Sequence, residues 1–246
     1  MSPLRRAKAL CRGVIAVLLL GVFSAGALLI APVMALGRTP ARCHGVVRAL
    51  WRLFARACRI AGMARIETSG LAGIGGSVIV ANHPSVLDVV VLVAACPRTL
   101  YVAKHALRRG SALSAVVRAT SLPDDERLIE SAAPYLAAGW NVLVFPEGTR
   151  TPADGALLPF HRGAAQLALR TGAPVVPVGI SYSRRIFGKG QRPWDFGPDR
   201  VTCRVTAGAA VKPEPVAEGT VRPRAVALTA ALRTTVESLR RATPCG

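Results

Sequence analysis

Two short polar motifs contain side chains suited to general-base catalysis and to anion binding. Residues 82–88 read Asn-His-Pro-Ser-Val-Leu-Asp, and residues 145–150 read Phe-Pro-Glu-Gly-Thr-Arg. His83 in the first motif can act as a base near neutral pH, with Asp88 to orient its ring. Arg150 in the second motif has the planar guanidinium that pairs best with a phosphate. Together these side chains suit acyl transfer to a lipid alcohol.

The spacing of the first motif leaves two roles open for Asp88. If Pro84 begins a helix, a position that proline tolerates well, His83 lies off the helix end and can turn back toward Asp88. The carboxylate would then accept a hydrogen bond from one ring nitrogen. The other nitrogen would take the proton of a hydroxyl as that hydroxyl attacks an acyl thioester. Alternatively, Ser85 and Asp88 form a capping pair that satisfies backbone N–H groups at a helix start.

The second motif brings together several groups that can bind a phosphate. Arg150 can make paired hydrogen bonds, and Thr149 and the amide of Gly148 can add single donors. Glu147 can either fix the loop or bind an acceptor hydroxyl. The alternative for the whole motif is a salt-bridged surface turn without a ligand.

The surrounding sequence predicts an α/β fold that places both motifs on loops after buried strands. Short apolar runs at 77–81 and 141–145 directly precede the motifs and are typical of such strands. Helical and strand patterns alternate along the rest of the chain. We predict strands at 99–103, 175–182 and 201–206, and helices at 86–95, 111–118, 128–138, 163–171 and 225–241. The segment 183–200, rich in Gly, Pro and Arg, is predicted to be a loop that borders the substrate groove.

Between about Val78 and Tyr182 the chain resembles the glycerolipid acyltransferase family. That family carries an Asn-His, four residues, Asp motif and a Phe-Pro-Glu-Gly-Thr-Arg motif, and both stand intact here. The resemblance implies an α/β domain with a mixed sheet flanked by helices. It also implies catalytic roles for His83 and Asp88 and phosphate recognition by residues 147–150. Acyl-CoA or acyl carrier protein would donate the acyl group directly, without an acyl-enzyme and without a bound cofactor.

Two further cations match the family pattern. Lys104 corresponds to a basic residue between the two motifs, and the segment 160–163, Phe-His-Arg-Gly, is similar to a Phe-Lys-x-Gly segment. His161 stands in place of the usual lysine, so the cationic role is expected to pass to Arg162. For either cation, a surface salt bridge is the alternative. A late apolar block of the family is matched at 175–179.

The segment 118–125 departs from the family pattern. The family usually has a glycine followed by Ile-Asp-Arg, whose arginine meets the acceptor phosphate, whereas this chain has Asp124 and Asp125. Two acids would repel a phosphate if they faced it. The predicted acceptor is therefore 1-acyl-glycerol-3-phosphate or a similar lysophospholipid, with a non-phosphorylated or specialised lipid of the aryl polyene type as the alternative. A membrane-tethered lipid-binding protein without turnover is a second alternative.

The N-terminal region predicts a membrane anchor. An uncharged run at 13–37 follows four basic residues and is long enough to span a bilayer, and it is too long for the apolar part of a signal peptide. Pro32 and several glycines also permit a re-entrant hairpin. We predict an anchor region at 1–62 and a catalytic domain at 63–246. Because acyl thioesters are cytosolic, we place that domain on the cytoplasmic face of a bacterial inner membrane.

The charge pattern favours a membrane over nucleic acid. The net charge is +19, and the first 80 residues contain 11 Lys or Arg but a single acid, Glu67. Val47, Trp51, Phe54 and Cys58 follow helical spacing beside a stripe of arginines, so this helix either lies in the headgroup layer or packs on the domain. The chain carries no recognised nucleic-acid module. The six cysteines show no Cys-x-x-Cys pairing, and the four histidines suggest no metal site.

Overall fold

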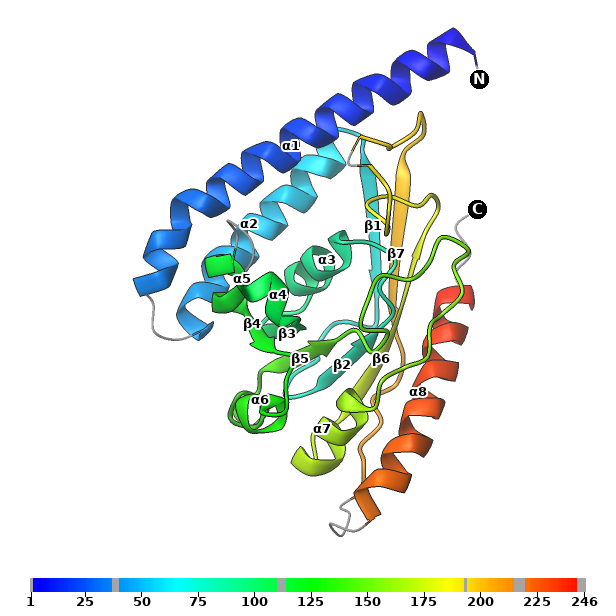
Figure 1. The fold of residues 1–246 in the computed structure, drawn as a ribbon. Coiled ribbons are helices and arrows are strands. Elements are labelled where there is room, and N and C mark those ends of the chain that lie inside the picture. The colour runs from blue at the N-terminus through cyan, green and yellow to red at the C-terminus, as the bar shows by residue number, and fades with distance from the viewer. Residues whose placement is uncertain (1, 37–39, 110–113, 193, 215–219, 243–246) are drawn as a thin grey trace.

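The computed structural model describes residues 2–36, 40–109, 114–192, 194–214 and 220–242. Its centre is a seven-stranded sheet with the strand order β1-β7-β6-β2-β5-β3-β4 (Figure 1). Neighbouring strands are parallel except β6 and β7, which pair antiparallel. The strands are β1 (Ala64–Ser69), β2 (Val78–Ala81), β3 (Thr99–Ala103), β4 (Ser121–Pro123), β5 (Asn141–Val144), β6 (Val175–Tyr182) and β7 (Val201–Ala207).

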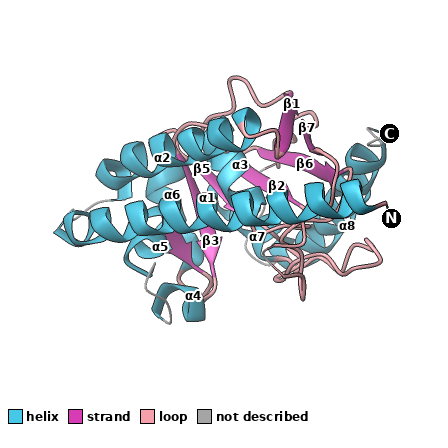
Figure 2. Cartoon of the chain, turned by 90° about the horizontal axis from the view of Figure 1, so that it is seen from above, coloured by secondary structure: helices cyan, strands magenta, loops and turns pink. Residues whose placement is uncertain are grey.

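Helices cover both faces of this sheet, which gives three layers (Figure 2). The helices are α1 (Pro3–Leu36), α2 (Pro40–Ile60), α3 (Leu87–Ala95), α4 (His105–Arg109), α5 (Ser114–Thr120), α6 (Leu128–Ala137), α7 (Gly163–Thr171) and α8 (Val221–Ala242). Apolar side chains of α3, with some from α2 and α5, pack on one face. Those of α6, α7 and α8 pack on the other. The predicted α/β class with a mixed sheet is confirmed.

The central strand β2 shows why the sheet is buried on both sides. Ile79 and Ala81 belong to the core beneath α3, while Val78 and Val80 belong to the core beneath α6 and α7. All four are fully buried. Alternate residues of a strand point to opposite faces, so an uninterrupted apolar run is what a strand covered by helices on both faces needs.

The parallel strands bring the two motifs to the same end of the sheet, where β2 and β5 have their carboxyl ends; we call this end the catalytic edge. β2 pairs directly with β5, in the register Val78↔Val142, and the first motif follows β2 while the second follows β5. β6 pairs with β2 on its other side, so the end of β6 and the loop 183–200 also reach this edge. Ligands of open α/β sheets bind outside the carboxyl ends of the strands, and both motifs lie there.

The two N-terminal helices pack against the domain. The apolar face of α2 is covered: Trp51 packs on the core beneath α3, Val47 packs on Val116 of α5, and Phe54 makes an edge-to-face contact with Phe23 of α1. Of the two predicted roles for this face, packing is therefore the one that the structure shows. By length and composition α1 is the one described helix that could cross a membrane. It runs unbroken from Pro3 to Leu36, so the structure does not form the alternative, a hairpin within residues 13–37.

Two helix predictions differ from the structure in detail. Helix α3 begins at Leu87, one residue after the predicted start at 86, and Pro84 does not open it. Val86 is the residue before the helix, and the chain from 82 to 86 forms the turn that carries His83. Residues 111–113 of the predicted helix 111–118 lie outside the described residues, and α5 continues to Thr120. The division at residue 62 stays a prediction.

Candidate functional site

The predicted base and its carboxylate are in contact. His83 Nδ1 lies 2.9 Å from Asp88 Oδ2, across a turn that joins β2 to α3. The His83 ring stacks on Phe145 of the second motif, with ring centroids 4.1 Å apart. With Nδ1 bonded to the carboxylate and one ring face on Phe145, Nε2 is the nitrogen left to act on a substrate. The contact gives Asp88 the orienting role predicted for it.

Asp88 is held by two further donors. The backbone N–H of Ser85 donates to Oδ2 at 2.7 Å, and the hydroxyl of Tyr182 donates to Oδ1 at 2.7 Å. Asp88 thus also makes the predicted capping contact, so the two roles coexist. Burial raises the pKa of this carboxyl, while hydrogen bonds from His83, Tyr182 and Ser85 act in the opposite direction. Burial likewise raises the pKa of Tyr182 well above its usual value, which keeps its hydroxyl a donor.

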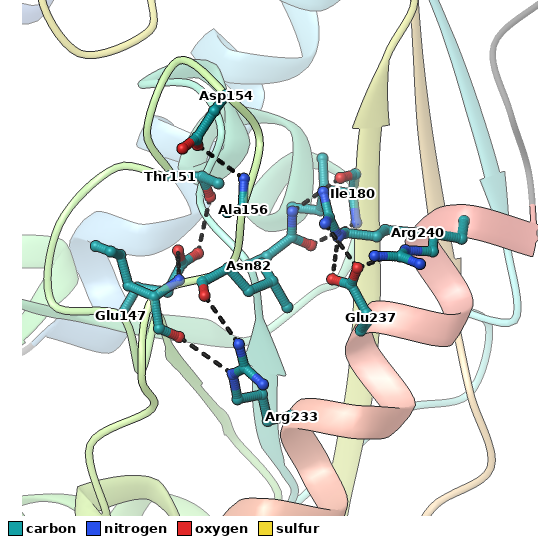
Figure 3. A network of polar contacts seen from close by, with 12 residues as sticks. Asn82, Glu147, Thr151, Asp154, Ala156, Ile180, Arg233, Glu237 and Arg240 are labelled. Carbon is teal, nitrogen blue, oxygen red and sulfur yellow. Dashed lines mark hydrogen bonds and ion pairs between the residues drawn. The ribbon is translucent and has the colours of Figure 1, made fainter.

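Glu147 connects the two motifs. Its buried carboxylate accepts a hydrogen bond from Thr151 Oγ1 at 2.8 Å (Figure 3). It also accepts from the His83 backbone N–H at 3.1 Å and from the Leu158 N–H at 3.1 Å. The Thr151 N–H donates back to the His83 carbonyl at 2.7 Å. These contacts show the loop-fixing role of Glu147, while binding of an acceptor hydroxyl stays a prediction. The Leu158 segment is in turn held by Arg233 of α8 (Figure 3).

Asn82 fastens the start of the first motif to β6. Its side-chain amide donates to the carbonyl of Ile180 at 2.9 Å, and its side-chain oxygen accepts from the Ile180 N–H at 2.7 Å (Figure 3). This pair continues the ladder between β2 and β6 after the last backbone partner of β2, Ala81. The turn that carries His83 is therefore attached to β6 by two side-chain hydrogen bonds.

The turn of the second motif requires a glycine at position 148. Gly148 has φ +63°, and a Cβ atom there would lie 3.3 Å from the ring of His161. Both the left-handed backbone and the close ring favour glycine. The His161 N–H donates to the Pro146 carbonyl at 2.8 Å, which fastens the Phe-His-Arg-Gly segment to the second motif. Exposed Arg162 follows immediately, at the start of α7.

Arg150 contacts the loop between β6 and β7. Its Nη1 donates to the carbonyls of Phe187 at 2.9 Å and Gly188 at 3.0 Å. The predicted loop at 183–200 therefore does border the site. A guanidinium has five N–H donors, so the groups on Nε and Nη2 are the ones that would meet a phosphate. Thr149 lies beside Arg150 and is half-buried.

The remaining predicted groups lie farther along the same edge. Exposed Lys104 directly follows β3, two strands from β2 in the sheet. Asp124 and Asp125 follow β4, one strand farther, and both are exposed. At about 4.8 Å per strand, these acids lie on the order of 14 Å from the line of β2. Among the described residues there is no group of three or more His, Cys, Asp or Glu that could hold a metal.

An apolar cavity adjoins the histidine turn. Tyr182, Leu87 and Phe187 line its inner side, and Ala16 and Phe54 from the N-terminal helices close the outer side. Of the three groups that donate hydrogen bonds to Asp88, Tyr182 is the one that the sequence did not predict. Its position as the last residue of a predicted strand was visible, but its contact with Asp88 depends on the pairing of β2 and β6.

The central part of the chain matches known acyltransferases. A family model described as "Acyltransferase" covers residues 59–181, half of the chain, including both motifs. The 1-acyl-sn-glycerol-3-phosphate acyltransferase alpha of Homo sapiens is 34% identical over 134 residues, which cover 50% of this chain and 47% of the human protein. The lyso-ornithine lipid O-acyltransferase of Pseudomonas aeruginosa is 36% identical over 123 residues, 43% of each chain. The chain thus spans about half the length of these relatives.

The fold is similar over a greater length. The crystal structure of the 1-acyl-sn-glycerophosphate acyltransferase from Thermotoga maritima has a TM-score of 0.66 and 24% sequence identity, covering 94% of this chain and 97% of that one. This likeness shows the same three-layer fold. The family match over residues 59–181 includes the paired motifs and the strands that position them. On that match, this chain belongs to the acyltransferase family.

Proposed function

We propose that this chain is an O-acyltransferase in lipid biosynthesis, which moves a fatty acyl group from acyl-CoA or acyl carrier protein to the free hydroxyl of 1-acyl-glycerol-3-phosphate or a similar lysophospholipid. The observation that carries the proposal is the 2.9 Å contact between His83 Nδ1 and the buried carboxylate of Asp88. It makes the histidine an oriented base at the edge of the sheet where ligands bind. Several similar proteins are named for this acceptor.

In the proposed reaction, Nε2 of His83 takes the proton of the acceptor hydroxyl while the hydroxyl oxygen attacks the thioester carbonyl carbon. The carbon–sulfur bond then breaks, and the leaving thiolate takes the proton from the imidazolium. Asp88 accepts the Nδ1–H hydrogen bond throughout and stabilises the imidazolium, as the acid does in hydrolase triads. The acceptor hydroxyl occupies the place of a serine, so no acyl-enzyme forms.

The acceptor phosphate would lie over the second motif. Arg150 can offer Nε and Nη2, and Thr149 and Gly148 can offer single donors. Lys104 and Arg162 are exposed cations on loops at the same edge of the sheet. The His83 backbone and Glu147 hold this loop at a fixed distance from the base.

A specialised acceptor is the second candidate. Asp124 and Asp125 stand where the family usually supplies an arginine, and one of the similar proteins is named for a lyso-ornithine lipid. Two exposed carboxylates would favour an acceptor with a positively charged group over one with a second anion. An assay in which lysophosphatidic acid competes with a lyso-lipid that carries an amine would show which of the two acceptors the protein acylates faster.

We also propose that the protein acts at the cytoplasmic face of a bacterial inner membrane. Helix α1 exposes a row of large apolar side chains, which include Leu10, Val14, Leu18 and Val22. The helix is long and apolar enough to enter a bilayer. Thioester donors are cytosolic, and the basic residues near the N-terminus would meet anionic lipid.

The test compares His83→Ala with His105→Ala in detergent, using labelled acyl-CoA or acyl carrier protein and lysophosphatidic acid. His105 is an exposed histidine of α4 outside the two motifs, so its replacement changes the same side chain without touching the base. We expect His83→Ala to lower the rate of phosphatidic acid formation by about 10²–10⁴-fold, and His105→Ala to leave it unchanged. Circular dichroism and the unfolding midpoint confirm that both variants fold.

Equal turnover by the wild type and His83→Ala would refute the mechanism. Absence of product from folded wild type with either donor, but product from an amine-bearing lyso-lipid, would favour the specialised acceptor. Absence of product with every acceptor, together with binding of lysolipid, would favour a lipid-binding protein without turnover.

A further inference from the structure

A second concave site lies between α1 and the loop before β7. It has a volume of about 570 Å³, and no residue of the two motifs lines it. Its walls are one side of α1, the end of α2 and the segment just before β7. The lining residues are Ala7, Lys8, Cys11, Arg12, Ile15, Ala61, Pro198, Asp199 and Arg200. We call this site the α1 groove.

The α1 groove is predominantly basic. Lys8, Arg12 and Arg200 line it against a single acid, Asp199, which itself pairs with Arg5 at 3.5 Å. Arg200 is fixed on one wall because its Nη2 donates to the Arg59 carbonyl at 3.0 Å. The groove therefore offers three cations to a ligand while its one carboxylate already has a partner.

Arg12 is the group that most clearly lacks a partner. Its Nη1 is buried, and within the part of the chain that the structure describes it has no hydrogen-bond acceptor. A buried donor on a charged group costs free energy when it is left unpaired, and an anion in the groove would satisfy it. The backbones of α1 and the loop approach closely here: a Cβ atom at Gly13 would lie 2.5 Å from the Trp194 carbonyl oxygen, which is too close for any side chain. Helix and loop are thus in backbone contact beside Arg12.

On the inner side of α1, the side chains change from basic to apolar along the helix. Lys8 and Arg12 are followed, one helical turn at a time, by Ala16 and Leu19, which line the apolar cavity. This cavity is completed by Phe54 and other apolar side chains of α2. The basic part of this side of the helix therefore ends where its apolar packing on the domain begins.

We propose that the α1 groove binds the phosphate headgroup of an anionic membrane phospholipid, at a site separate from the catalytic edge. Arg12 and Lys8 donate to the phosphate oxygens, and Arg200 completes the cationic wall. Guanidinium groups suit phosphate because they donate two parallel hydrogen bonds. The headgroup source is favoured over a free anion because the outward side of the same helix exposes Leu10 and Val14, which places the groove at a lipid surface. The bound lipid would hold α1 against the loop that also contacts Arg150.

The test measures the unfolding midpoint of the full chain in neutral dodecyl maltoside micelles at 0.15 M salt, titrated with phosphatidylglycerol, with phosphatidylcholine, or with inorganic phosphate. A ligand that binds the folded state raises the midpoint with its concentration. Arg12→Gln is compared with Arg6→Gln, which removes the same charge from the same helix at an exposed position outside the groove. Lys8→Gln, also in the groove but exposed, serves if Arg12→Gln does not fold.

We expect phosphatidylglycerol, but not phosphatidylcholine, to stabilise the wild type. Arg12→Gln should weaken its apparent affinity by roughly 10- to 100-fold, as the loss of a charge-assisted hydrogen bond implies. Lys8→Gln should weaken it in the same direction, and Arg6→Gln should stay within about twofold because salt screens an exposed charge. Equal losses for Arg6→Gln and Arg12→Gln, or no effect of phosphatidylglycerol on the wild type, would overturn the site. Full stabilisation by inorganic phosphate alone would overturn the lipid source. The measurement needs no turnover, so its result is independent of the proposed enzymatic activity.

Discussion

At Asp88, burial and hydrogen bonding act on one carboxyl in opposite directions. Removal from water favours the neutral acid, whereas donors from His83, Ser85 and Tyr182 favour the carboxylate. The ionised form is the one that can stabilise a histidine imidazolium. In the proposed mechanism, each donor therefore helps His83 to act as a base at lower pH, although His83 alone of these four residues would meet the substrate.

The Tyr182→Phe variant tests this coupling. Phenylalanine keeps the ring but removes the hydroxyl that donates to Asp88 Oδ1 at 2.7 Å. Because that bond lowers the pKa of Asp88, its loss raises the pKa, and the acid limb of the kcat/KM profile should move to higher pH. We expect kcat to fall roughly tenfold at neutral pH, since only part of the general-base contribution is lost.

The control is Tyr135→Phe on α6, which removes the hydroxyl of a half-buried tyrosine outside the site. It should change neither kcat nor the pH profile. A purely structural role for Tyr182 would appear instead as a lower unfolding midpoint with an unmoved acid limb, and that outcome would refute a positioning role.

Contacts between residues close in sequence could be predicted at this site, whereas contacts between distant residues could not. His83 and Asp88 are five residues apart, so their contact could be predicted from a local turn. Tyr182 is 94 residues from Asp88, and it reaches the carboxylate only because β6 pairs with β2. Nothing in the local sequence specifies that strand pairing. The sequence left the role of Glu147 undecided for the same reason, since one of its contacts comes from the His83 backbone, 64 residues away.

Among the elements, the loop between β6 and β7 is the one whose position depends on the second motif. Arg150 Nη1 bonds the carbonyls of Phe187 and Gly188, and the Phe187 carbonyl also accepts from the Val86 N–H at 3.4 Å. Phe187 and Ile186 line the apolar cavity. One arginine thus connects the proposed phosphate site to the cavity wall.

Replacement of Arg150 by alanine should have two measurable effects. We expect the acceptor KM to rise about tenfold or more, because a charge-assisted contact to phosphate is lost. We also expect faster amide hydrogen exchange between residues 184 and 191 in the absence of substrate, because both carbonyl contacts are lost. Steady-state kinetics and hydrogen-exchange mass spectrometry measure the two effects separately.

The matched control is Arg170→Ala, which removes an exposed arginine at the end of α7. It should leave both the acceptor KM and the loop exchange unchanged. If Arg150→Ala raises KM without any change in exchange, the arginine acts on phosphate alone and the loop contacts contribute no stability.

The elements that sequence reasoning missed lie at the two ends of the sheet or are very short. β1 has one buried residue, Ala64, followed by the charged Arg65 and Glu67, and it is held by pairing with β7. β4 has three residues and, within the described part of the chain, pairs with β3 alone. Helix α4 has five residues. Such segments lack a long apolar pattern, and their structure comes from partners distant in sequence. The central strands β2, β5 and β6 were predicted because continuous burial leaves a continuous apolar run.

At the scale of the whole molecule, α1 has two different sides. Ala16 packs in a small core with Met63, Ile186 and Phe196, whereas Leu18 and Val22 are 61% and 67% exposed. The inner side is therefore part of the protein, and the outer side is free to meet lipid. Figure 1 shows α1 lying along α2 at one side of the sheet domain.

Leu18→Glu tests the membrane role of the outer side. A charge on this side is costly in an apolar phase, by about 2.5–3.5 kcal/mol at a bilayer centre, but costs little on an exposed surface in water. We expect a several-fold larger fraction of the protein in the supernatant after ultracentrifugation of membranes. The unfolding midpoint in detergent should change little.

Leu107→Glu on α4 is the control, because Leu107 is also exposed, at 57%, but lies outside α1. Its membrane fraction should equal that of the wild type. Equal release by both variants, or release by neither, would contradict the proposed role of α1 as the anchor.

The contact between Gly13 and Trp194 sets an order of events during synthesis. Helix α1 is made before the loop on which its inner side packs, and that loop is completed only near residue 200. At about 5–20 residues per second, translation of the intervening chain takes roughly 10–40 s. Throughout this interval the inner side of α1 can contact α2 and Met63, but it lacks the packing that Ile186, Phe196 and the Trp194 backbone later supply. Helix α1 is thus made well before the loop on which it packs, and it reaches its final packing only after that loop.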